Sequence, residues 1–128
     1  MNIIFVIYVE DQKRSREFYQ RILKQDPILD VEGMTEFKIN ENTKLGIMPE
    51  SGIVKLLKNK IINPSKAKGV SRCEIYLYVD SPEEFYKRAI LFGAKPISES
   101  LIRDWGDEVA YCVDFDGNVI AFARKIKS

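Results

Sequence analysis

The sequence predicts an α+β fold built from two units of the same design. Twice, a short apolar strand runs into an acidic residue and then into a helix with a Glu-Phe-Tyr triplet, first at residues 4–11 and 17–19 and again at residues 75–80 and 84–86. A repeat of this kind marks supersecondary units that each bury an apolar face against a partner. Three short strand-like segments separated by turn residues follow each helix. Each unit is therefore predicted to be βαβββ.

The first unit is predicted to span residues 1–50. Its opening strand, residues 3–9, is a continuous run of β-branched and aromatic residues, which is typical of a strand buried on both faces. Asp11 is a suitable N-cap for the next helix, which ends before the Asp-Pro pair at residues 26–27. Strands are then predicted at residues 28–31, 35–39 and 44–48, with turns at residue 33 and at residues 40–42.

The second unit, residues 73–128, repeats this order. A strand at residues 74–79 precedes a helix with Ser81 as its cap and Pro82 at its first position, and Gly93 ends that helix. The helix side chains expected to face the sheet are Phe85, Ala89, Leu91 and Phe92. Strands follow at residues 96–98, 108–113 and 118–124, and a turn at residues 114–118 joins the last two.

Residues 51–72 are predicted to link the two units. This segment contains five lysines, one arginine and no acidic residue, and its residues 53–57 can form one or two amphipathic turns. One interpretation is a solvated linker with an anchored stretch. The other is a basic rim that favours an anionic ligand.

The composition excludes several classes of function. The chain has 128 residues, the size of one domain, and its 20 basic and 19 acidic residues create no field that would attract nucleic acid or acidic membranes. No apolar run approaches the ~18 residues of a membrane span, and the chain opens directly on a strand without signal-peptide features. Cys73 and Cys112 lack the density of a disulfide framework. We therefore expect a cytoplasmic protein with free thiols that binds neither nucleic acid nor membranes.

Four motifs together resemble the vicinal oxygen chelate superfamily, which contains glyoxalase I, extradiol dioxygenases and the bleomycin resistance proteins. They are Val9-x-Asp11 after the first strand, a Ser-x-x-Phe-Tyr pattern at residues 15–19, the strand at residues 76–80, and residues 105–120, which begin with Trp-Gly and contain an Asp-Phe-Asp-Gly-Asn turn. In that turn Phe115 replaces the proline usual in the family. The resemblance implies that both modules form one open, barrel-like mixed sheet around a cleft, with the helices outside. It also implies a homodimer, as in many relatives.

The resemblance identifies four positions that hold a divalent metal ion in the enzymes of the family, where the ligands are usually histidine and glutamate. The matching residues here are Ile4, Gly46, Glu74 and Ala121. One carboxylate cannot supply the three or more donor atoms that such an ion needs, and the chain contains no histidine. We therefore expect no metal and no other cofactor, and the alternative is that Glu74 joins ligands from elsewhere in the chain.

Glu74 shares its strand face with Tyr76 and Tyr78, because side chains alternate along a strand. Its carboxylate is either satisfied by a tyrosine hydroxyl or an arginine at the mouth of the cleft, or it pairs with a cationic or hydrogen-bond-donating ligand. Aromatic rings that stack on planar ligands and polar groups that orient them complete the expected site. The residues expected to bind a ligand are Tyr8, Phe37, Met48, Glu74, Tyr76, Tyr78, Arg103, Trp105 and Tyr111. The facing of residues 37, 78 and 111 depends on a single register step.

The function predicted from these features is metal-free binding of the bleomycin-resistance type, in which a small, partly aromatic molecule is sequestered without being altered, as in antibiotic resistance. No catalytic residue is predicted, since the sequence has no nucleophile elbow, no phosphate-binding loop and no Cys-His pair. One alternative is a lyase, isomerase or dioxygenase-like enzyme of the same superfamily that uses Glu74 as a base. Another is a dimeric interaction module with a vestigial cleft.

Overall fold

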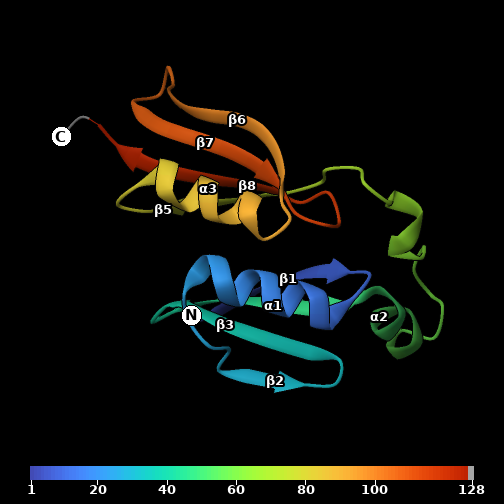
Figure 1. Cartoon of the computed structure of the whole chain (residues 1–128). Helices are drawn as coiled ribbons and strands as arrows, with labels where there is room; N and C mark the ends of the chain where they lie inside the picture. The colour runs from blue at the N-terminus through green and yellow to red at the C-terminus, as the bar shows by residue number, and fades with distance from the viewer. Residues whose placement is uncertain (127–128) are drawn as a thin grey trace. The chain divides into compact units, whose positions relative to one another are not determined.

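Two four-stranded mixed sheets, each with a helix packed on it, form the protein (Figure 1). The structure is a computed structural model that describes residues 1–126. The chain divides into two compact units between Lys68 and Gly69. Each unit contains the element order βαβββ, which in the first unit is followed by two short helices, and this confirms the predicted α+β class and the predicted repeat.

The first unit has the strand order β1-β4-β3-β2. Strands β1 and β4 are parallel, and the β2–β3 and β3–β4 pairs are antiparallel. Helix α1 packs on one face of this sheet, against β3 and β4. The bounds of these elements are β1 (Ile3–Val9), α1 (Gln12–Leu23), β2 (Leu29–Val31), β3 (Met34–Asn40) and β4 (Thr43–Pro49).

Strand β1 lies at the edge of this sheet and has one exposed face, so the expectation that it is buried on both faces is wrong. Ile7 and Val9 are buried, whereas Ile4 and Tyr8 on the opposite face are 41% and 39% exposed. The apolar run indicated a strand correctly but could not show that one face of the strand is exposed.

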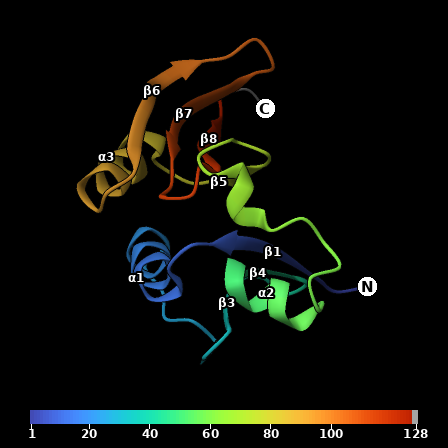
Figure 2. The same cartoon turned by 90° about the vertical axis from the view of Figure 1, so that its right-hand side faces the viewer.

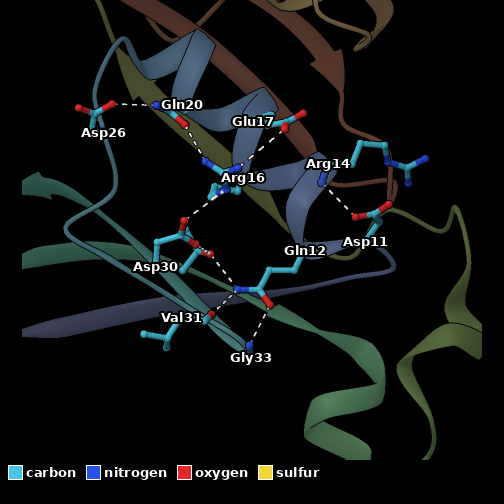
Figure 3. A network of polar contacts seen from close by, with 11 residues as sticks. Asp11, Gln12, Arg14, Arg16, Glu17, Gln20, Asp26, Asp30, Val31 and Gly33 are labelled. Atoms are coloured by element: carbon cyan, nitrogen blue, oxygen red, sulfur yellow. Dashed lines mark hydrogen bonds and ion pairs between the residues drawn. The ribbon is translucent and has the colours of Figure 1, made fainter.

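Helix α1 begins and ends where local chemistry predicts. The Asp11 carboxylate accepts a hydrogen bond from the Arg14 backbone N–H at 3.0 Å, and the helix ends at Lys24, which has a left-handed φ of 54°. Figure 3 shows how the helix is joined to the β2–β3 turn. The Gln12 side chain accepts a hydrogen bond from the Gly33 N–H, and the Arg16 guanidinium lies 3.4 Å from the Asp30 carboxylate.

The second unit repeats this topology with the strand order β5-β8-β7-β6, in which β5 and β8 are parallel. The Ser81 hydroxyl accepts a hydrogen bond from the Glu84 N–H at 3.3 Å and so caps helix α3, as predicted. The helix ends before Gly93, whose φ of 112° suits glycine. The bounds are β5 (Glu74–Tyr78), α3 (Pro82–Leu91), β6 (Lys95–Ile102), β7 (Asp107–Val113) and β8 (Val119–Lys125).

Helix α3 packs through Phe85, whose ring centroid lies 5.6 Å from that of Phe122 on β8, and through the buried Ala89. Leu91 was expected on the same face, but it is 77% exposed. Two residues span about 200° around a helix, so residues 89 and 91 point to nearly opposite sides. Strand β6 is also longer than the predicted residues 96–98, because two register shifts let it stay paired with β7.

Two short helices occupy the basic segment that was predicted to link the units, and both lie within the first unit. Helix α2 (Glu50–Leu56) follows β4 directly (Figure 2) and packs on it with Ile53 buried. The 3₁₀ helix η1 (Pro64–Ala67) follows, with the Asn63 side chain accepting a hydrogen bond from the Ser65 N–H. Among the described residues, no helix is long and apolar enough to cross a membrane.

Candidate ligand-binding site

The sheet of the second unit has one face covered by α3 and a second face that carries aromatic and charged side chains. Phe122 points toward α3, so its neighbours Ala121 and Ala123 point to the opposite face. The partners of Ala121 across the sheet are Tyr76 on β5 and Tyr111 on β7, and Ala123 is paired with Tyr78 and Val109. We call this surface the aromatic face and define it by Glu74, Tyr76, Tyr78, Arg103, Trp105, Asp107 and Tyr111.

The floor of the aromatic face consists of small apolar side chains. Val109, Ala121 and Ala123 are fully buried, and Tyr76 and Tyr111 pack against them. The alanine side chains on the central strand β8 are small, so the two tyrosines on the neighbouring strands extend further from the sheet on either side of them. The register therefore arranges aromatic rings on both sides of an apolar floor.

Asp107 joins three of the aromatic side chains by hydrogen bonds. Its Oδ2 accepts from the Tyr76 hydroxyl at 2.6 Å and from the Tyr78 hydroxyl at 2.9 Å. The Trp105 indole Nε1 then donates to the Tyr76 hydroxyl at 2.8 Å. Asp107 is only 3% exposed, whereas Trp105 is 60% exposed. A buried carboxylate thus fixes the orientation of rings that solvent can reach.

These contacts fix the protonation states of the cluster. Burial, followed by the hydrogen bond to Asp107, raises the pKa of Tyr76 to about 12. The pKa of Asp107 is lowered, chiefly by the hydrogen bond from Tyr76 and further by that from Tyr78 and by the charge of Lys125. At neutral pH the Asp107 carboxyl is therefore ionised and the Tyr76 phenol keeps its proton.

Arg103 and Glu74 are the remaining polar groups of the aromatic face. The Arg103 Nη2 donates to the Ser98 hydroxyl at 2.7 Å and to the Val109 carbonyl at 3.0 Å, and the guanidinium lies 5.0 Å from the centroid of the Tyr111 ring. Its Nε is buried and has no hydrogen-bond partner in the described part of the chain. Glu74 is exposed and forms no hydrogen bond or ion pair with any residue from 1 to 126. The hydroxyls of Tyr76 and Tyr78, which share its strand face, donate to Asp107 rather than to Glu74.

Comparison with known families agrees with the fold. Residues 1–127 match the family model of the glyoxalase-like domain. The chain belongs to this family. This confirms the resemblance to the vicinal oxygen chelate superfamily.

Solved structures resemble the glyoxalase-like domain along almost its whole length. A glyoxalase-related enzyme from Fulvimarina pelagi is 13% identical with a TM-score of 0.81, and the match covers 98% of this chain and 88% of that one. A glyoxalase/bleomycin resistance protein/dioxygenase family enzyme from Burkholderia phytofirmans PsJN is 15% identical with a TM-score of 0.78, covering 96% and 97%. A glyoxalase/bleomycin resistance protein from Albidiferax ferrireducens T118 is 18% identical with a TM-score of 0.70, covering 95% and 96%. Such identities show a shared fold alone. No curated protein matches the sequence.

The four positions that the resemblance assigns to the metal ligands of the family form one pair in each unit. In the first, a Cβ atom on Gly46 would lie 3.1 Å from a methyl group of Ile4. In the second, Ala121 is paired with Tyr76, two residues from Glu74 on the same strand face. Only the glutamate carries donor atoms, and the described residues contain no group of three His, Cys, Asp or Glu side chains that could hold an ion. These residues therefore do not fit the metal of the family's enzymes.

The structure brings together six of the nine residues that the sequence suggested for ligand binding, all in the second unit. Tyr8 and Met48 belong to the first unit, where they are register partners on adjacent strands. Phe37 is placed wrongly by the sequence. It is fully buried and pairs with the buried Leu45, on the side of the sheet that faces α1. The register of β3 with β4 therefore settles which way the Phe37 side chain faces, and Phe37 is a core residue.

Sequence reasoning missed Asp107 as a residue of the site. An acidic residue after Trp-Gly at the start of a strand resembles an ordinary turn residue. Strand alternation gives a usable signal, because residues 107, 109 and 111 share one face of β7. The partners of Asp107 lie 29 and 31 residues earlier in the chain, so the contacts themselves could not be read from the sequence.

Proposed function

We propose that this glyoxalase-like domain binds a small, partly aromatic molecule on the aromatic face and sequesters it without using a metal ion. The observation that carries the proposal is the hydrogen-bond chain from Trp105 through Tyr76 to Asp107, which also holds Tyr78. Rings fixed before a ligand arrives lose little conformational entropy on binding. Tyrosine and tryptophan rings also supply large contact areas with a polar edge.

The charged groups of the aromatic face support recognition of a polar substituent on such a molecule. The Glu74 carboxylate is exposed and forms no hydrogen bond or ion pair among residues 1–126, so it is available to a ligand. Arg103 is oriented by Ser98 and by the Val109 carbonyl, next to the Tyr111 ring. We propose that stacking supplies the affinity and that Glu74 and Arg103 orient the ligand.

The single tryptophan gives a direct test. Trp105 fluorescence and the melting temperature are measured while a panel of planar antibiotics and metabolites is titrated. We expect quenching and stabilisation by some members. Tyr78→Ala should weaken binding about two- to tenfold, the equivalent of ~0.5–1.5 kcal/mol for one aromatic contact. Leu91→Ala, at an exposed position on α3, is the matched control and should leave binding unchanged. A panel that changes neither signal would contradict the proposal.

A second candidate function is a lyase or isomerase of the glyoxalase type in which Glu74 acts as a base. The observation that favours it is the same exposed carboxylate without a partner in the described chain. Elemental analysis of the purified protein and assay of a hemithioacetal substrate test it. Turnover that is lost in Glu74→Gln and kept in Glu99→Gln, an exposed glutamate on β6, would establish this activity in place of sequestration.

The resemblance to bleomycin resistance proteins further suggests a cytoplasmic homodimer that protects its host from an antibiotic. Sedimentation equilibrium of the purified chain measures the oligomeric state. Expression in an antibiotic-sensitive host, with Tyr78→Ala compared with the unchanged chain, measures protection. If the host is equally sensitive to the antibiotic with and without the protein that carries no substitution, the resistance role is contradicted.

A further inference from the structure

The direction of every hydrogen bond in the cluster around Asp107 is fixed by chemistry. An ionised carboxylate can only accept, so both tyrosine hydroxyls must donate their protons to it. The indole N–H of Trp105 can only donate, so the Tyr76 oxygen must accept from it. Both hydroxyl protons and the indole proton are thus used within the cluster.

Tyr76, Tyr78 and Trp105 therefore have no polar proton left to donate to a ligand, and the polar atoms that they leave available are acceptors. Tyr78 is 57% exposed, and its oxygen keeps lone pairs while its only proton is given to Asp107. The exposed Glu74 carboxylate adds a charged acceptor on the same strand face. We propose, on the basis of the ligand-binding function above, that Asp107 determines specificity by turning both hydroxyl protons inward. The aromatic face then selects a ring that carries donor groups, such as a protonated amine or amidine, over a ring that carries a carboxylate.

Two cations on the same face favour a ring that carries a carboxylate, which is the opposite of the proposed preference. The two possibilities can therefore be told apart by experiment. Arg103 donates through Nη2 to Ser98 and to the Val109 carbonyl and lies against the Tyr111 ring. The Lys125 ammonium lies 5.0 Å from the centroid of the Tyr78 ring. Both cations are thus in contact with aromatic rings of the protein, whereas Glu74 has no such partner in the described range.

The experiment compares benzamidine with benzoate, which share a ring and differ in hydrogen-bond polarity and charge. Binding to the full chain is followed by the indole N–H resonance in NMR, where one tryptophan gives one signal. We expect benzamidine to bind at least about tenfold more tightly. In Asp107→Asn the new amide N–H occupies one tyrosine oxygen and turns that hydroxyl proton outward, so the preference should fall below about threefold.

The matched control is Asp104→Asn, which makes the same charge change at an exposed residue of the turn before β7. It should keep the full preference for benzamidine. If Asp107→Asn does not fold, Tyr78→Phe tests the same point. It removes the outward acceptor of Tyr78 together with its hydrogen bond to Asp107, and it keeps the bond from Tyr76 to Asp107. It should weaken benzamidine binding and leave benzoate binding unchanged.

The outcomes separate this inference from the proposed function. Benzoate binding as tightly as benzamidine would overturn the inference and leave the binding function intact. A preference for benzoate that Arg103→Met abolishes would assign specificity to Arg103 instead. An undiminished preference in Asp107→Asn would remove Asp107 as its determinant. If neither probe moves the Trp105 resonance, the proposed function fails for this ligand class and the inference fails with it.

Discussion

The Gln12 side chain is predicted to stabilise the first unit by joining α1 to the β2–β3 turn. Its Oε1 accepts from the Gly33 N–H at 2.9 Å (Figure 3). Its Nε2 donates to the Val31 carbonyl at 2.8 Å and to the Thr35 hydroxyl at 2.9 Å. Gln12→Ala removes all three hydrogen bonds and leaves the helix backbone intact.

The expected cost follows from the surroundings of these bonds. A hydrogen bond contributes a net ~0.5–1.5 kcal/mol, and less where water replaces it. The bond to the Val31 carbonyl is exposed, whereas those to Gly33 and Thr35 are partly buried. The two partly buried bonds therefore predict a loss of about 1–3 kcal/mol in the free energy of unfolding.

Urea unfolding and amide hydrogen exchange measure this effect together. We expect a lower unfolding midpoint and faster exchange at the Gly33 amide, which loses its acceptor. Gln20→Ala is the matched control, because Gln20 lies on the same helix and forms hydrogen bonds with Arg16 and with the exposed Asp26 carboxylate rather than with the turn. It should leave Gly33 exchange unchanged. Equal effects of the two substitutions, or unchanged exchange in Gln12→Ala, would refute the reasoning.

Three further predictions concern the second unit. Because the pKa of Tyr76 is raised to about 12, its neutral form stabilises the fold. This contribution to the free energy of unfolding is complete below the ordinary pKa near 10 and is lost as the pH rises through about 12. Unfolding measured at each pH should show this loss in the unchanged protein and not in Tyr76→Phe. Gly117→Ala should cost about 2 kcal/mol or more in urea unfolding, because φ is 91° and the new methyl group would lie 2.8 Å from the carbonyl carbon of Gly69. Cys112 is fully buried with its pKa raised to about 12, so iodoacetamide should modify Cys73 first in the native protein; equal rates would contradict this burial.

Much of the fold could be predicted because its signals are local. Asp11 and Ser81 cap their helices through backbone groups three residues away, and such pairs form from neighbouring residues. The turn at residues 114–118 is likewise local, with the Asp114 carboxylate accepting from the N–H groups of residues 116 and 118. The repeat then indicates two units of equal topology.

The side of a helix or sheet on which a side chain lies was predicted less well than the type of each element. The misplaced Leu91 depended on the rotation of one helix against its sheet. The misplaced Phe37 depended on the register of β3 with β4, where one step exchanges the two faces. Glu74, Tyr76 and Tyr78 were assigned one face correctly, because alternation within a single strand needs no partner.

By itself, the sequence determined the two βαβββ units, their helix caps and turns, and the absence of donor atoms at three of the four positions that the resemblance assigns to metal ligands. These are properties of residue type and of neighbours along the chain. Only the tertiary structure brought Trp105, Tyr76 and Tyr78 into one cluster around Asp107. That cluster exists because β8 pairs with both β5 and β7, which brings together residues about 30 positions apart. Long-range strand pairing follows from the packing of the whole unit, and no local pattern encodes it.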